Sequence, residues 1–158
     1  MGIETAIDRG PAPQRGLAMM EFTIVLPVLL LLLMATAEFG RLLYQYNSLT
    51  QSVRDGVRFV SAHALNGTTG LVVLDQNLID ATRNMVVYGR PGGGEEPVLR
   101  GLTTADVAVT SPDPAHVTVT VLEYQYQPMF APALPSFSGE PPVAMSFPLR
   151  AGITMRAL

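Results

Sequence analysis

The sequence contains no cysteine and no lysine among its 158 residues. The lack of cysteine excludes disulfides, zinc–thiolate sites and thiol catalysis, so any domain outside a membrane must be held together by its core alone. All ten cationic side chains are arginine, and the formal net charge of −3 is too weak to imply nucleic acid as a partner. The length suffices for one domain.

Motifs that carry enzyme chemistry are also lacking. His63 and His116 could form a metal site only with carboxylates, and no spaced cluster of carboxylates accompanies them. The triple glycine at 92–94 is not followed by Lys-Ser/Thr, so it is not a phosphate loop, and no serine lies in a nucleophile elbow. The sequence therefore predicts no cofactor and no enzymatic activity, which disfavours an envelope enzyme with a single membrane span.

Hydrophobic residues make up 48% of the chain, and they are concentrated near the N-terminus. Phe22 to Ala37 is a run without charge that includes five consecutive leucines, and a globular core helix rarely has this pattern because one face must meet water. Pro27 removes one backbone hydrogen bond and is expected to kink the helix in the membrane, where such prolines are tolerated.

The length of this run decides where a membrane span would end. Sixteen helical residues cover about 24 Å, slightly less than a hydrocarbon core of about 30 Å. Leu17 to Met20 before the run and Phe39 to Tyr44 after it supply the missing length, which predicts a span over about residues 18–42. Glu21 and Glu38 then lie near the two interfaces.

The helical period continues past Glu38, which predicts one helix from about residue 18 to about residue 64. The expected apolar seam is Phe39, Leu42, Leu43, Tyr46, Leu49, Val53, Val57, Val60 and Ala64. The opposite side carries Gln45, Ser48, Ser52, Arg54, Asp55 and Arg58. Glu38–Arg41 and Asp55–Arg58 are spaced for ion pairs that weakly support the helix, and Asn66-Gly67 ends it.

The second half of the chain predicts a small α+β domain. Asp75 can cap a second helix that extends to about Tyr88, and a glycine-rich loop follows over residues 89–101. Alternating valines then indicate two strands separated by a turn at residues 111–114. The second strand is expected to continue through Tyr124 and Tyr126 to Pro128. The two tyrosines then share one sheet face and belong either to the core or to a partner surface, and the core is favoured. The last strand is expected from Ala144 to Arg156, broken at Pro148 and Gly152.

These elements define the expected fold class and domains. The class is α+β, with the amphipathic half of the long helix packed on an antiparallel sheet of three or four strands. Residues 1–16 form a leader, because their glycines and prolines break any helix. Residues 17–64 form the long helix, and residues 65–158 form the α+β domain.

The segment from Gly16 to Phe22 is a candidate processing site. A small residue precedes four residues, a glutamate, an aromatic residue and the apolar run, so a peptidase at the cytoplasmic membrane face could cut between Gly16 and Leu17. Glu21 would then be the fifth residue of the mature chain, where an acid at the edge of the lipid needs a partner such as the α-amino group of a neighbouring subunit. Alternatively, Glu21 only marks the start of a membrane helix.

Residues 15–62 resemble the N-terminal domain of the TadE-like family, the pseudopilins of tight-adherence (Flp-type) pili. The resemblance rests on a glycine, four intervening residues and Glu-Phe, then an apolar run with an early proline, Glu-Phe-Gly-Arg, an aromatic-rich turn and Arg-x-Gly-x-Arg. The corresponding residues are Gly16, Glu21, Phe22, Pro27, Glu38, Phe39, Gly40, Arg41, Tyr44, Tyr46, Arg54, Gly56 and Arg58. The chain departs from the family at Gln51-Ser52-Val53, where small alanines are usual.

The resemblance implies a type IV pilin-like fold and a specific cellular route. A prepilin peptidase would cut between Gly16 and Leu17, and the product would remain in the bacterial inner membrane, with its C-terminal domain outside the cytoplasm, until it primes or enters a filament. The implied partners are other pilin and pseudopilin subunits, the inner-membrane assembly platform and membrane lipid. Adherence and biofilm formation would be the cellular roles.

A soluble exported protein is the alternative interpretation. Ala35-Thr36-Ala37 fits the small-x-small site of signal peptidase, and cleavage there would release a chain that starts at Glu38. Two observations disfavour it: the region up to Glu21 has a net charge of −1, whereas such regions are usually positive, and the helical seam continues directly past Glu38.

Overall fold

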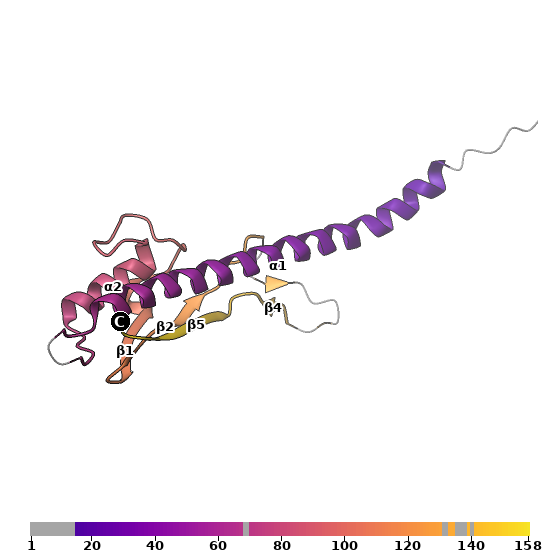
Figure 1. Cartoon of the computed structure of the whole chain (residues 1–158). Coiled ribbons are helices and arrows are strands. Elements are labelled where there is room, and N and C mark those ends of the chain that lie inside the picture. The colour runs from indigo at the N-terminus through magenta and orange to yellow at the C-terminus, as the bar shows by residue number, and fades with distance from the viewer. Residues whose placement is uncertain (1–14, 68–69, 131–132, 135–138, 140) are drawn as a thin grey trace, which may run out of the picture. The chain divides into compact units, whose positions relative to one another are not determined.

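The computed structural model describes residues 15–67, 70–130, 133–134, 139 and 141–158 (Figure 1). The elements are helices α1 (Arg15–His63) and α2 (Gln76–Tyr88), the short 3-10 helix η1 (Thr104–Asp106), and strands β1 (Val107–Asp113), β2 (His116–Gln125), β3 (Ala133–Leu134), β4 (Val143–Ala144) and β5 (Pro148–Arg156). The chain divides into two compact units, Met1–Ala37 and Glu38–Leu158. The expected α+β class is confirmed, and the leader lies outside the described residues except for Arg15 and Gly16.

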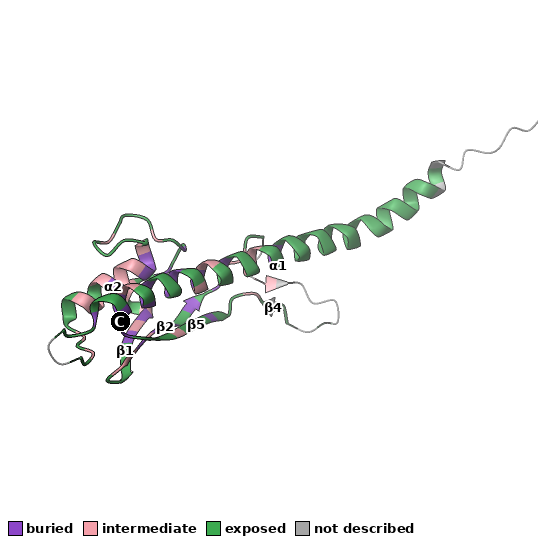
Figure 2. Cartoon of the chain, viewed as in Figure 1, coloured by how far each residue is buried: buried purple, intermediate pink, exposed green. Residues whose placement is uncertain are grey.

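The part of α1 in the first unit has no core of its own. All residues from 18 to 37 are exposed, as Figure 2 shows in green. The hydroxyls of Thr23 and Thr36 donate to the carbonyls of Met19 and Leu32, each at 2.8 Å, so these polar groups are satisfied inside the helix. By length and composition the helix can cross a membrane. The kink expected at Pro27, which lies inside α1, stays a prediction.

Helix α2 begins and ends as its sequence predicts. The carboxylate of Asp75 accepts a hydrogen bond from the backbone N–H of Leu78 at 2.6 Å, which satisfies one of the free donors of the first turn. Gly89 ends the helix in the left-handed conformation, with φ of 68°, and its N–H donates to the carbonyl of Met85. These caps fix both ends of a helix that packs on the core of the second unit.

The main sheet has three strands in the order β1-β2-β5, and both neighbouring pairs are antiparallel. Val119 of β2 lies between Val109 of β1 and Ile153 of β5, which places apolar side chains of all three strands on one face. Thr118 and Thr154 lie on the opposite face, where their hydroxyls are 2.8 Å apart. The alternation predicted for the two valine-rich strands is confirmed.

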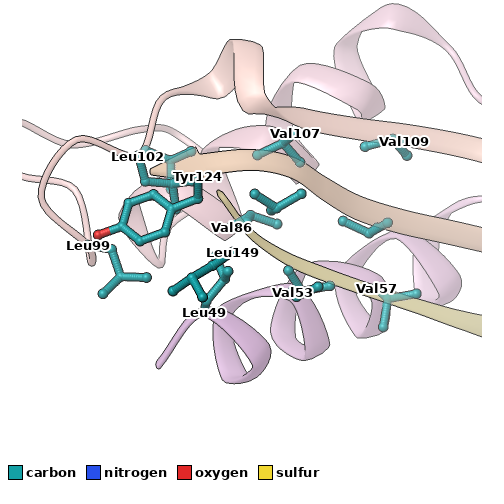
Figure 3. Close-up of a cluster of buried hydrophobic side chains, with 14 of the residues drawn as sticks. Leu49, Val53, Val57, Val86, Leu99, Leu102, Val107, Val109, Tyr124 and Leu149 are labelled. Atoms are coloured by element: carbon teal, nitrogen blue, oxygen red, sulfur yellow. The ribbon is translucent and has the colours of Figure 1, made fainter. Parts of the chain in front are cut away.

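The core fills the space between one face of this sheet and the two helices. Figure 3 shows Leu49, Val53 and Val57 of α1 directed toward side chains of the strands and of α2. Tyr124 and Tyr126 are 2% and 1% exposed, so both lie in the core as expected. Other buried members are Val60, Val86, Val87, Leu99, Leu102, Val107, Val109, Val117, Val119, Val121, Leu149 and Ala151.

The C-terminal strands differ from the expectation. Ala144 belongs to β4, which pairs with β3 in a separate two-stranded sheet, and β5 begins at Pro148. A proline fits the first position of a strand because that position can spare the missing N–H. The expected break at Gly152 is wrong, since β5 continues through this residue opposite Thr120. Strand β2 ends at Gln125, three residues before the predicted end.

Candidate processing and assembly site

The candidate processing site lies at the start of α1. Gly16 is exposed, and a Cβ atom built on it would meet no other atom within 4 Å. The Gly16–Leu17 bond lies in the first turn, whose N–H groups have no partner inside the helix and which therefore frays most easily. Access of a peptidase to this bond is thus compatible with the local geometry, and cleavage stays a prediction.

Glu21 and Phe22 follow one turn later. Both are exposed, with Phe22 at 59%. Within the described part of the chain, the Glu21 carboxylate has no hydrogen-bond or ion-pair partner, although it lies next to the apolar run. An acid in such surroundings needs a cation or a donor from elsewhere. The partner expected from a second subunit therefore has an accessible carboxylate to bind.

Glu38 is the first residue of the second unit, and its side chain is enclosed there. It is 7% exposed, and its carboxylate accepts hydrogen bonds from the Tyr126 hydroxyl and from the backbone N–H of Met129, the latter at 3.0 and 3.2 Å. Burial, and then the neighbouring Glu38 carboxylate, raise the pKa of Tyr126 to about 12. Glu38 thus joins α1 to the segment that follows β2, and its expected place near a membrane interface stays a prediction.

Arg41 and Gln45 extend this junction along α1. Arg41 Nε and Gln45 Nε2 both donate to the carbonyl of Gln127, at 3.2 and 3.3 Å. The Tyr124 hydroxyl lies 3.4 Å from Gln45 Oε1 and 3.2 Å from the carbonyl of Arg100. Burial raises the pKa of Tyr124, so its hydroxyl keeps its proton as a donor for these acceptors.

The glycine of the expected Arg-x-Gly-x-Arg segment has a clear packing role. A Cβ atom on Gly56 would collide with Cγ2 of Val86, so the glycine lets α1 and α2 approach closely. Gly40 differs, because a Cβ atom there would meet nothing within 4 Å. Arg54 and Arg58 are exposed, and within the described residues their side chains have no partner.

Three expectations about the second half of α1 are wrong. The described residues contain neither a Glu38–Arg41 nor an Asp55–Arg58 ion pair. In the first case, Arg41 donates to a carbonyl and Glu38 accepts from neutral donors. Gln45 and Ser52, placed on the solvent side, are each 5% exposed. Conversely, the expected seam residues Phe39, Leu43 and Tyr46 are 61%, 46% and 46% exposed. The core-facing stripe therefore passes through Glu38, Gln45, Ser52 and Gly56.

The polar contacts of Tyr126, Gln127 and Met129 are not predicted by the sequence patterns. A usable signal was present in Tyr124 and Tyr126, because buried tyrosines need partners for their hydroxyls and α1 carries polar side chains such as Glu38 and Gln45. The other contacts use the backbone carbonyl of Gln127 and the backbone N–H of Met129, which carry no side-chain signature in the sequence. For the described residues, no group of three or more His, Asp or Glu side chains could hold a metal ion.

These features define a class: an apolar helix long enough to cross a membrane, continued by an amphipathic half that packs into a small α+β unit. The family model described as TadE-like protein matches residues 16–58. This match covers the whole apolar run, the Glu38-Phe39-Gly40-Arg41 motif and Gly56, and it confirms the TadE-like resemblance over these residues. No curated protein and no solved structure matches the chain.

Proposed function

We propose that the protein is a minor pilin, or pseudopilin, of a tight-adherence pilus, anchored in the bacterial inner membrane and active in pilus assembly or priming. The supporting observation is that the TadE-like match spans both the exposed apolar run and the helical half that carries the folded unit. The role is structural and not enzymatic, and adherence is its cellular outcome. The partners are the prepilin peptidase, other pilin and pseudopilin subunits, and the inner-membrane assembly platform.

The proposed topology follows from the order of the segments. Residues 1–16 stay in the cytoplasm until the prepilin peptidase removes them, the apolar run spans the membrane, and residues 65–158 lie outside the cytoplasm together with the packed half of α1. The anchoring of Glu38 in the folded unit supports a span that ends close to Ala37, earlier than residue 42.

Glu21 is the proposed assembly residue. A carboxylate without a partner among the described residues can pair with the new α-amino group of an adjacent subunit, and in lipid such a pair is not screened by water. The apolar halves of neighbouring helices would then pack by shape, as membrane helices do. Phe22 lies beside this carboxylate and adds contact area.

One observation favours a second candidate, the soluble exported protein. The second compact unit begins at Glu38, which is the residue that signal peptidase would leave after Ala37. Export as a soluble domain would thus release an intact folded unit. Against this candidate, the TadE-like match continues across residue 37 without interruption.

Complementation tests the proposed role. A strain lacking the gene is expected to lose surface pili and surface adherence, and the wild-type chain restores both. Glu21→Gln is expected to leave the protein in the membrane yet fail to restore pili, because the paired charge is lost. Glu95→Gln, the same substitution at an exposed glutamate outside the residues that the family model matches, is the control for expression and should restore pili. Normal piliation in the deletion strain contradicts the proposal.

A further inference from the structure

Several apolar side chains of the second unit are exposed near the point where the chain enters it. We use the term collar for Phe39, Leu43, Tyr44, Met129 and Phe130, which are 61%, 46%, 70%, 63% and 46% exposed. Three come from the first two turns of α1 after Ala37. The other two come from the segment after β2. A hydrogen bond from the Met129 N–H to the Glu38 carboxylate connects this segment to α1. One end of the folded unit therefore presents a concentrated apolar surface.

The charged groups at this end are shielded. The Glu38 carboxylate, which would oppose entry into a lipid surface, is 7% exposed and holds two donors of the folded unit. Arg41 is partly buried, and its Nε atom donates to the Gln127 carbonyl, which leaves the rest of the guanidinium for an outside acceptor such as a lipid phosphate. The collar thus combines exposed apolar groups with satisfied or phosphate-compatible polar groups.

The dimensions of the collar match a headgroup layer. Phe39 and Tyr44 are separated by about 7.5 Å along the helix. The polar layer on each side of a bilayer is about 5–7.5 Å thick, given about 40–45 Å in total and about 30 Å of hydrocarbon. Aromatic side chains are enriched in this layer because their apolar rings and polar tips suit it. The collar follows the apolar run directly in the chain, so a membrane crossed by that run would meet the collar next.

From these observations we propose that the collar is inserted in the headgroup layer of the membrane that α1 crosses, and that it holds the folded unit at a fixed depth on the lipid surface. This proposal rests on the membrane anchoring in the proposed function. Glu38 acts as a positioning residue, since its bond to Met129 holds the loop part of the collar at the level of the first helical turn.

Site-directed spin labelling tests the proposal, and the cysteine-free chain allows a single label per variant. The full-length chain is reconstituted in liposomes of phosphatidylethanolamine and phosphatidylglycerol, with one nitroxide at Met129→Cys or Phe130→Cys. Relaxation by oxygen, which concentrates in lipid, is compared with relaxation by a water-soluble nickel chelate. Labels in the collar are expected to show an oxygen-to-nickel ratio several-fold higher than a control label in water.

Val73→Cys is the matched control. Val73 is 50% exposed, like the collar residues, but its N–H donates to the carbonyl of Ala64, which lies about 39 Å along α1 from Glu38. Leu30→Cys, in the middle of the apolar run, reports whether the anchor itself is in lipid. If the Leu30 label has the high oxygen-to-nickel ratio of lipid while the Met129 and Phe130 labels have the low ratio of the Val73 label, the collar proposal is wrong. The membrane anchoring by the apolar run is then still supported. If the Leu30 label is also in water, the membrane anchoring fails first.

Two further outcomes separate the proposal from its rivals. Collar labels that are shielded from both reagents, and only at high protein-to-lipid ratio, would show that another copy covers the surface, which overturns lipid insertion. In a Glu38→Ala background, the Phe130 label is expected to lose its high ratio, whereas a label at Tyr44→Cys keeps it. Equal loss at both positions would indicate general unfolding and would refute the positioning role.

Discussion

Replacing Gly56 by alanine tests the helix contact on which the second unit depends. In an exposed helix, Gly→Ala stabilises by about 1 kcal/mol because it removes the flexibility of glycine. At Gly56 the new Cβ atom would collide with Cγ2 of Val86, a fully buried β-branched side chain with little rotamer freedom in α2. Overpacking of this kind costs about 1–3 kcal/mol, so the propensity gain is cancelled or exceeded.

The control is Gly40→Ala in the same helix, where a Cβ atom meets nothing within 4 Å. Chemical unfolding of the detergent-solubilised full-length chain, followed by near-ultraviolet circular dichroism, should place Gly56→Ala below Gly40→Ala by about 1–3 kcal/mol in the free energy of unfolding. In a Val86→Ala background the penalty of Gly56→Ala should disappear, since Cγ2 is absent and the contact at Cβ of Val86 is an ordinary 3.7 Å. Equal stabilisation by both alanine variants in the wild-type background would show that the contact between α1 and α2 does not require glycine at position 56.

Three further predictions concern the polar contacts of the second unit. The pKa of Tyr126 is raised to about 12, so its neutral hydroxyl stabilises the folded state fully below pH 10. This contribution to the free energy of unfolding is lost as the pH rises from about 10 through 12. Tyrosinate absorbance should show one tyrosine that titrates at higher pH than the others, and Tyr126→Phe should remove it. Glu38→Gln should lower the free energy of unfolding by about 1–3 kcal/mol, because the amide oxygen can replace only Oε1 and the new N–H₂ in place of Oε2 faces the Met129 N–H donor. The measurement is the denaturant midpoint, and an unchanged midpoint would contradict this. Asp75→Ala should lower the free energy of unfolding by about 1 kcal/mol, because the Leu78 N–H loses its acceptor at the start of α2. Asp75→Asn can still accept that hydrogen bond and should lower it less in the same unfolding assay.

The elements with strong periodicity could be predicted from the sequence. The uniform apolar run and the caps at Asp75 and Gly89 determine the two helices, since each feature acts locally. The valines of β1 and β2 alternate with polar residues, and this pattern alone sets which face is buried. The last strand was less predictable, because Pro148 and Gly152 are read as breaks although one begins β5 and the other lies inside it.

The contacts of the polar stripe on α1 could not be predicted. Whether Glu38 and Gln45 face solvent or the core depends on tyrosines about 80 to 90 residues later in the chain. A helical pattern that counts only apolar residues assigns such side chains to the surface. The same limitation made Phe39 and Tyr46 seem part of the core, although the folded unit leaves them exposed.

The N-terminus of the mature protein distinguishes a pseudopilin from a soluble exported domain. Intact mass and N-terminal sequencing would be carried out on membranes from strains with and without the prepilin peptidase. The account predicts a start at Leu17 that depends on the peptidase and disappears in Gly16→Ala. A start at Glu38 in the soluble fraction would contradict it and would identify the protein as an ordinary exported domain.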